Sequence, residues 1–217
     1  MKNLKFAILI TFSVFMLSSC KSNVEVINAW KSDKLNTMKN SNILVITRTA
    51  DNKERGAFEE QMVAYLKNKN IKSSTSYMKL PVFDIQRKYS DEEKKELVEN
   101  IKKMGFDAII LTSLKRRTEK TVVTQGGYYA SGSYSNLYPK YYGGFNGYYN
   151  NIGYETYVPS RTRIDVQAKF VLETVMYNLN LPATEQLVAV VTSAIDDPES
   201  VYTASEKYVK EIANSLR

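Results

Sequence analysis

Hydrophobic residues in the segment 42–217 follow two spacings, one typical of buried strands and one typical of helices. Residues 43–46 (Ile-Leu-Val-Ile) are wholly apolar, and residues 107–111 are apolar after the first position. Short apolar runs of this kind are typical of strands that are covered on both faces. Residues 71–80 predict a weaker strand between them. The three segments therefore predict strands of one sheet.

Two segments place their apolar residues on one helical stripe, at spacings of three or four residues. In residues 56–69 the stripe consists of Phe58, Met62, Tyr65 and Leu66. The second helix begins at a capping box, in which Ser90 and Glu93 satisfy each other's free backbone amides. Its stripe is Leu97, Ile101 and Met104, and Gly105 suits its C-terminal end.

A strand pair and a last helix are predicted after residue 160. Residues 161–177 alternate, with Ile164, Val166, Ala168, Phe170, Leu172 and Met176 on one face and Asp165, Gln167, Lys169 and Glu173 on the other. This period of two predicts a long antiparallel strand with its polar face in water. Residues 187–195 form its partner. A helix then begins at Asp197-Pro198, with Asp197 as its cap. Its inner face is Val201, Tyr208, Val209, Ile212 and Leu216.

The predicted order is β-α-β-α-β, a long insert, and then β-β-α. This order predicts an α/β fold with a mixed sheet of about five strands, because β-α-β steps favour parallel neighbours and the later hairpin adds antiparallel ones. We expect the helices mainly on one face, which leaves the polar side of residues 161–177 in water. Residues 42–217 are therefore predicted to form a single domain, with an insert at residues 124–158 that is rich in Tyr and Gly.

The insert has an unusual composition. Residues 126–151 hold eight Tyr and six Gly, and Lys140 is their one charged residue. Glycine raises the entropy lost on ordering, so this stretch cannot form an aliphatic core. Three interpretations of this stretch stay open: a surface loop lying on the sheet, a recognition loop, or a membrane hairpin of an oligomeric pore. A recognition loop would contact its partner through Tyr128, Tyr129, Tyr134, Tyr138, Tyr141, Tyr142, Tyr148 and Tyr149.

The start of the chain indicates export. Residues 1–19 carry Lys2 and Lys5 ahead of an apolar run at 6–17, which is too short to cross about 30 Å of hydrocarbon as a helix. The run ends in Leu17-Ser18-Ser19-Cys20, which resembles the lipobox of bacterial lipoproteins. The resemblance implies cleavage before Cys20, a diacylglycerol on its sulfur, and an acyl chain such as palmitate on its amine.

Cys20 is the single cysteine of the chain. Lipidation would consume it, so no intramolecular disulfide would form and the fold would depend on its core. Two or more acyl chains would attach the protein firmly to a membrane. Residues 20–41 are mostly polar and are predicted to form the lipidated cysteine and a tether, with a short strand at 24–30 and Trp30 packed on the domain.

No catalytic residue, metal ligand or cofactor is predicted. The chain lacks His, and one Cys cannot form a zinc site. No glycine-rich phosphate loop follows a strand. Arg48, Asp51 and Arg55 follow the first buried strand, where open α/β sheets bind ligands, but we interpret them as a helix cap with solvated charges. Residues 115–117 (Lys-Arg-Arg), at the end of a strand, are also interpreted as solvated.

The element order resembles that of a known group. The runs at residues 42–81 and 105–114, the Tyr/Gly loop, the long hairpin and the final helix resemble uncharacterised Bacteroidetes-type envelope lipoproteins of Gram-negative bacteria. They are similar in order to the N-terminal domain of the Tol-system translocation protein and to the curli-secretion lipoprotein. The resemblance implies an α/β fold and carries no family active site to this chain.

The sequence therefore predicts a non-catalytic, lipid-anchored protein of the cell envelope, at the outer membrane. Its partners would be the membrane and an envelope protein or glycan. The net charge of +7 mildly favours anionic partners, but basic and acidic residues are interspersed, which does not indicate nucleic acid. A subunit of an oligomeric secretion or pore assembly is the alternative function, and an envelope enzyme is a distant one. The oligomeric state and the leaflet stay open.

Overall fold

The structure is a computed structural model and describes residues 24–80, 89–121, 155–157, 166–196, 198 and 200–217. Its elements are β1 (Val24–Lys31), η1 (Asp33–Asn40), β2 (Ile43–Arg48), α2 (Asn52–Asn68), β3 (Ser73–Thr75), α3 (Asp91–Lys103), β4 (Ala108–Thr121), β5 (Glu155–Tyr157), β6 (Val166–Asn178), β7 (Leu187–Asp196) and α6 (Val201–Ser215).

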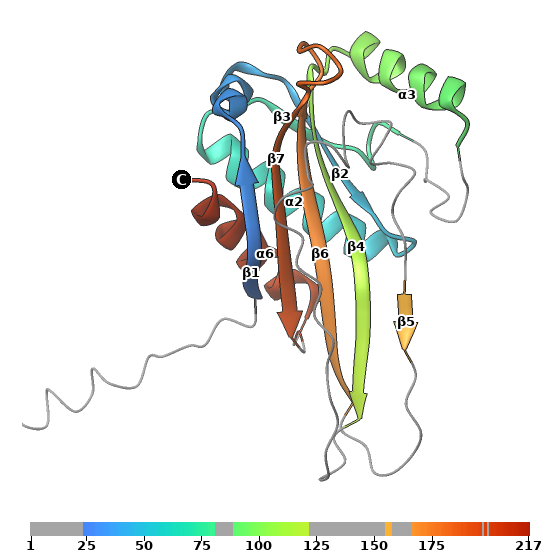
Figure 1. The fold of residues 1–217 in the computed structure, drawn as a ribbon, viewed down its shortest axis with the longest axis vertical. Coiled ribbons are helices and arrows are strands. Elements are labelled where there is room, and N and C mark those ends of the chain that lie inside the picture. Colours follow the sequence, from blue (N-terminus) through green and yellow to red (C-terminus); the bar gives the residue numbers. More distant parts are fainter. Residues whose placement is uncertain (1–23, 81–88, 122–154, 158–165, 197, 199) are drawn as a thin grey trace, which may run out of the picture.

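Within these residues, the strands form one mixed sheet in the order β1-β7-β6-β4-β2-β3 (Figure 1). β2 pairs in parallel with β3 and β4, while β4, β6, β7 and β1 are antiparallel neighbours. β5 pairs with β4 beyond the end of β2. The α/β fold with a mixed sheet is therefore confirmed, including all five strands that the sequence predicted.

β1 is the short strand predicted at residues 24–30, and it forms an edge of the sheet although the sequence assigned it to the tether. Its alternating burial directs Val24 and Val26 to one face of the sheet, while Trp30 packs on the other face, against Val190 among others. Trp30 thus packs on the domain, as expected. A register shift between Val26 and Asn28 separates Val24 and Val26 on one face from Trp30 on the other, while burial alternates along the whole strand. The large apolar residues Val24, Val26, Ile27 and Trp30 therefore do not follow one alternation, and the strand signal in the sequence is weak.

α2 and α6 cover one face of the sheet. The predicted apolar stripes face inward, and Met62, Leu66, Tyr208, Val209 and Ile212 are buried in one core with side chains of the strands. The rings of Phe58 and Tyr208 meet edge to face, with 5.4 Å between their centroids. The two helices therefore pack against each other as well as on the sheet.

α3 packs on the opposite face, near one end of the strands. Its Ile101 is fully buried with Leu44 and Ile109, and Leu97 and Val98 pack beside them. The predicted capping box between Ser90 and Glu93 is present, and Gly105 adopts φ +84° just after the helix. Met104, predicted to lie on the inner stripe, is exposed instead.

The expectation that the polar side of residues 161–177 lies in water is wrong for part of β6. Lys169 is exposed, but Glu173 is 3% exposed and Val175 and Tyr177 are buried. The reason is that this face becomes apolar toward Asn178, where it joins the core under α3. α6 also begins later than predicted, with Ser200 as its N-cap; Asp197 lies outside the described residues.

Candidate functional site

The residues predicted to function lie outside the part of the chain that the structure describes. These are Cys20 and the eight tyrosines between residues 128 and 149. The structure does describe the strands on either side of the insert, which are β4 before it and β6 after it. It also describes where β1 begins. The geometry of this end of the sheet therefore shows from which strand ends the chain continues toward the predicted anchor and the predicted contact surface.

One row of paired residues crosses the sheet at this end. Val24 of β1 pairs with Ile195, Ile195 with Phe170, and Phe170 with Arg117. β4 and β6 continue past this row until Thr121 pairs with Val166. At about 3.3 Å per residue, this extension projects roughly 13 Å. The insert thus leaves the sheet at the end where β1 begins (Figure 1).

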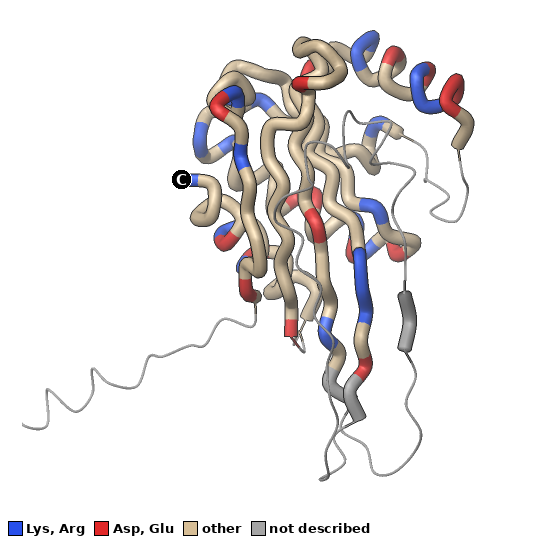
Figure 2. Tube along the Cα trace, in the orientation of Figure 1, with Lys and Arg blue, Asp and Glu red and all other residues tan. Residues whose placement is uncertain are grey.

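The charges at this end are mostly arranged in pairs. Figure 2 shows the basic stretch at residues 115–117 inside β4, not at its end as predicted. Arg117 forms an ion pair with Glu119 at 2.5 Å, and its guanidinium lies over the ring of Phe170 at 5.6 Å. Lys169 pairs with Asp196 at 3.3 Å. Because acids accompany the bases, the described residues at this end form no strong cationic patch.

A buried polar group lies in the middle of β6, on the face opposite α2 and α6. Glu173 pairs with Lys115, with 3.4 Å between Oε1 and Nζ. Ser113 and Thr192 are the residues directly opposite Glu173 on β4 and β7, and both are buried. A buried carboxylate needs a nearby cation to offset its lost hydration. Lys115 therefore offsets the charge of a buried carboxylate, which corrects its interpretation as a solvated charge.

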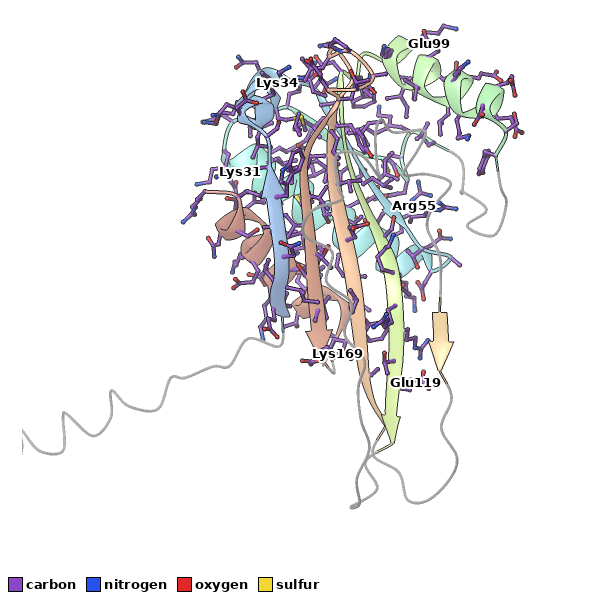
Figure 3. The ribbon with its side chains drawn as sticks, in the orientation of Figure 1. Lys31, Lys34, Arg55, Glu99, Glu119 and Lys169 are labelled. Atoms are coloured by element: carbon purple, nitrogen blue, oxygen red, sulfur yellow. The ribbon has the colours of Figure 1, made fainter. Side chains whose placement is uncertain are left out.

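A second buried network occupies the C-terminal ends of β2 and β3. Glu59 of α2 is fully buried and accepts five hydrogen bonds, from Arg55 Nε, the Ser76 hydroxyl and the backbone N–H groups of Thr47, Ser76 and Tyr77. Arg55, labelled in Figure 3, also donates to Ser76 Oγ at 2.7 Å. We call this set the Glu59 network.

The Glu59 network changes how the charged residues that follow β2 are interpreted. Asp51 caps α2 by accepting from the N–H groups of Lys53 and Glu54, as predicted. Arg55, however, is 3% exposed, so its interpretation as a solvated charge is wrong. A carboxylate with five donors has its lone pairs in use and cannot serve as a general base. The protein's own groups thus fill the place where an open α/β sheet would bind a ligand.

A groove of about 660 Å³ opens at the opposite end of the helix layer, between η1, α2 and α6. Its floor reaches down to the sheet at Ile43, Ile110 and Met176. Its walls include Met38, Met62, Leu66, Val209 and Ile212. Four basic residues and one acid also line it, namely Lys31, Lys39, Lys69, Arg217 and Asp33. The groove is therefore apolar inside and cationic around its mouth.

Sequence reasoning did not find this groove. Its residues come from β1, η1, β2, α2, β4, β6 and α6, which only the tertiary fold brings together. The lysines gave no signal of their own, because basic residues near a helix C-terminus, such as Lys67 and Lys69, are common for local electrostatic reasons. The Glu59 network was missed because the pattern does not distinguish a buried acid from an exposed one.

Two further features are absent from the described residues. No three of their His, Cys, Asp and Glu side chains gather closely enough to hold a metal ion. In the same part of the chain, no helix is both long and apolar enough to cross a membrane.

Comparison with known proteins yields similar solved structures only. No family model and no curated protein matches the chain. The PelC dodecamer from Paraburkholderia phytofirmans matches with 6% identity and a TM-score of 0.44, covering 89% of this chain and 96% of that one. A DUF4136 family protein from Bacteroides thetaiotaomicron matches with 15% identity and a TM-score of 0.35, covering 90% and 95%. Neither likeness is strong enough to carry a function to this chain, and the resemblance to the Tol and curli proteins stays a prediction.

Proposed function

We propose that this protein is a lipid-anchored, non-catalytic protein of the cell envelope, whose α/β domain presents the Tyr/Gly insert to an envelope protein or glycan. The support comes from the export signal, from Cys20 at the position that lipidation requires, and from the architecture of the sheet. The observation that carries the proposal is that β1 begins at Val24, at the same end of the sheet from which the insert leaves.

The distances favour a membrane-proximal insert. Cys20 precedes Val24 by four residues, which span at most about 14 Å when extended. The extension of β4 and β6 beyond Val24 is roughly the same length. A domain tied at Cys20 would therefore hold the roots of the insert close to the bilayer surface. Partners within or next to the membrane are the ones that the tyrosines would reach.

The anchor is tested with a Cys20→Ala variant and metabolic labelling with a palmitate analogue. We expect label on the parent and none on the variant, and we expect the variant to leave the outer-membrane fraction. A Ser22→Ala variant, which keeps the cysteine, is the matched control and should behave as the parent. Absence of label on the parent, with unchanged fractionation of Cys20→Ala, would contradict the proposed anchor.

The insert is tested by replacing residues 126–151 with a short Gly/Ser linker. We expect the variant to fold and stay membrane-bound, because the pairing of β4 with β6 in the described residues, from Ala108 with Asn178 to Thr121 with Val166, uses no residue of this segment. Cross-linking in intact cells should lose the partner adduct. A second variant with all eight tyrosines changed to Phe separates ring contacts from hydroxyl contacts. An unfolded deletion variant would mean that the tyrosines belong to the core.

A subunit of an oligomeric secretion or pore assembly is the second candidate. The observation that favours it is the two-stranded extension of β4 and β6, which points away from the domain toward the insert. Such a subunit would give a ladder of cross-linked species in membranes, ending at a ring. A binding domain would give adducts with a single partner. The same cross-linking experiment thus separates the two functions.

A further inference from the structure

The geometry points to the groove between η1, α2 and α6 as a binding site for a single-chain anionic amphiphile, with a fatty-acid carboxylate as its occupant. This site goes beyond the proposed envelope function and does not depend on acylation of Cys20. It lies at the end of β1 that carries Lys31, which Figure 3 labels, whereas the chain continues toward the predicted anchor from the other end of β1, at Val24.

The interior of the groove suits an alkyl chain. Its floor of Ile43, Ile110 and Met176 belongs to the sheet, so the groove passes through the whole helix layer. Leu35, Tyr65, Ile71 and Leu216 pack against the core and line the groove, but they are only partly buried. A bound chain would complete their burial, at about 0.8 kcal/mol for each buried CH₂ group. Three methionines, Met38, Met62 and Met176, give the lining the adaptability that a flexible chain needs.

The mouth of the groove suits a negative head group. Lys39 of η1 and Lys69, just after α2, are exposed and line the groove. Lys69 is held over the ring of Tyr65, with 5.9 Å between Nζ and the ring centroid. Lys31 donates hydrogen bonds to the backbone oxygens of Leu216 and Arg217, so its ammonium group already has partners within the protein. Lys39 and Lys69 are therefore the cations that would meet a carboxylate.

The volume favours a single chain over a peptide helix. The groove holds about 660 Å³, within the roughly 300–1,000 Å³ typical of small-molecule sites. Two turns of an α-helix, about 11 Å long and 10 Å wide, already occupy roughly 850 Å³. Contact between Phe58 and Tyr208 also holds α2 and α6 together beyond the groove, which limits its length. An amphipathic helix from a partner would consequently not enter to the depth of the sheet.

The test uses the full chain in phosphatidylcholine nanodiscs and a palmitate analogue with a photoreactive diazirine near the end of its chain. We expect cross-links in peptides that contain Met38, Met62 or Met176. Unlabelled palmitate should compete, while the hexadecyltrimethylammonium cation, which has the same chain length and the opposite charge, should not. Cross-links elsewhere in the chain, or equal competition by the two amphiphiles, would overturn the assignment.

Two variants test the apolar interior of the groove and its charged mouth separately. Ala213→Trp fills the groove from α6 and should abolish labelling. The double variant Lys39→Glu/Lys69→Glu reverses the charge at the mouth, and we expect about tenfold weaker competition by palmitate. Lys102→Glu/Lys103→Glu, with the same charge change on the exposed side of α3, is the matched control and should label as the parent.

The surface variants decide the question even if Ala213→Trp does not fold, because Lys39 and Lys69 are exposed and neither belongs to the buried core. Unchanged affinity in the Lys39/Lys69 variant would overturn the proposal. So would a cross-linked dimer joined through Lys39 or Lys69 without palmitate binding, since a second copy of the chain would then occupy the groove.

Discussion

Glu59 shows how one side chain can join three segments. It lies on α2, yet it accepts hydrogen bonds from the backbone at the end of β2 and from the segment after β3. Its sequence neighbour Glu60 is exposed and accepts a hydrogen bond from the Tyr77 hydroxyl. Adjacent glutamates of identical chemistry thus have opposite environments, because successive helix positions face different directions. No pattern in the sequence separates them without the position of the strands.

Replacing Glu59 with Gln should destabilise the domain strongly. The glutamine side chain would carry an NH₂ group, which donates hydrogen bonds, at a place where the surrounding groups also donate. It would also leave the buried Arg55 without the negative charge that it now pairs with. Breaking a buried ion pair in this way costs about 3–5 kcal/mol in the free energy of unfolding. Urea denaturation followed by circular dichroism measures the loss. Glu60→Gln is the matched control, with an expected change within about 1 kcal/mol; equal effects of the two substitutions would contradict the role of Glu59.

Tyr208 links stability to alkaline pH. Burial raises the pKa of its hydroxyl above the usual value near 10, while its hydrogen bond with Thr174, at 2.9 Å, acts in the opposite direction. A raised pKa in the folded state favours the neutral form, so its contribution to stability is complete below the unfolded pKa and declines as pH rises above about 10.

We expect Tyr208→Phe to be less stable than the parent near neutral pH, by about 1 kcal/mol for the lost hydrogen bond. The gap between variant and parent should shrink between pH 9 and pH 11, since only the parent has to keep this hydroxyl protonated. Urea midpoints at the two pH values measure the gap, and comparing the two proteins cancels the titration of the other tyrosines. A gap that does not change with pH would show that Tyr208 does not contribute.

Helices and strands with strong local signals were predictable. The stripes of α2 and α6, the capping box of α3 and the apolar strands β2 and β7 all appear where the pattern placed them. β4 is different, because it continues through Lys-Arg-Arg-Thr-Glu-Lys-Thr to Thr121. These residues have no apolar alternation, and their strand conformation depends on pairing with β6 from Val166 onward. Such non-local pairing cannot be deduced from a local window.

The cap of α3 provides a test at the scale of one element. Ser90→Ala removes the side chain that accepts from the Glu93 N–H, at a typical cost of about 1 kcal/mol. Ser90→Asp keeps an acceptor at the helix start and should restore most of the stability. Amide hydrogen exchange in the first turn of α3 reports the effect locally. Equal exchange in Ser90→Ala and the parent would mean that packing on Leu44 and Ile109 alone holds the helix.

At the scale of the whole molecule, the sequence predicted the fold class but not the structure at the two ends of the sheet. One end carries β1's first residue together with the extension of β4 and β6, and the other carries the groove. The candidate contact residues were chosen by composition alone, and they lie outside the described residues. What the structure adds is the direction in which β4 and β6 extend from the domain toward the insert that joins them in the sequence.

That direction can be tested by lengthening the tether. Inserting ten Gly/Ser residues after Ser22 should preserve membrane attachment while the insert end moves away from the bilayer, since a flexible linker of this length adds a mean reach of roughly 17 Å. Energy transfer from a fluorophore at the insert to an acceptor in the lipid would report the separation. Partner cross-linking should fall with it. Unchanged energy transfer would contradict a position fixed by the short tether.

The pairing of Val24 with Ile195 also has a consequence for how the chain matures. β1, the first strand in the chain, is synthesised early. β7, its only described strand neighbour, is synthesised much later. Until then the segment at residues 24–31 offers unpaired amides and carbonyls to any other extended chain, which is a known hazard for self-association. The sheet is therefore complete only when these two remote strands meet, and the interval most exposed to self-association falls between the synthesis of β1 and that of β7.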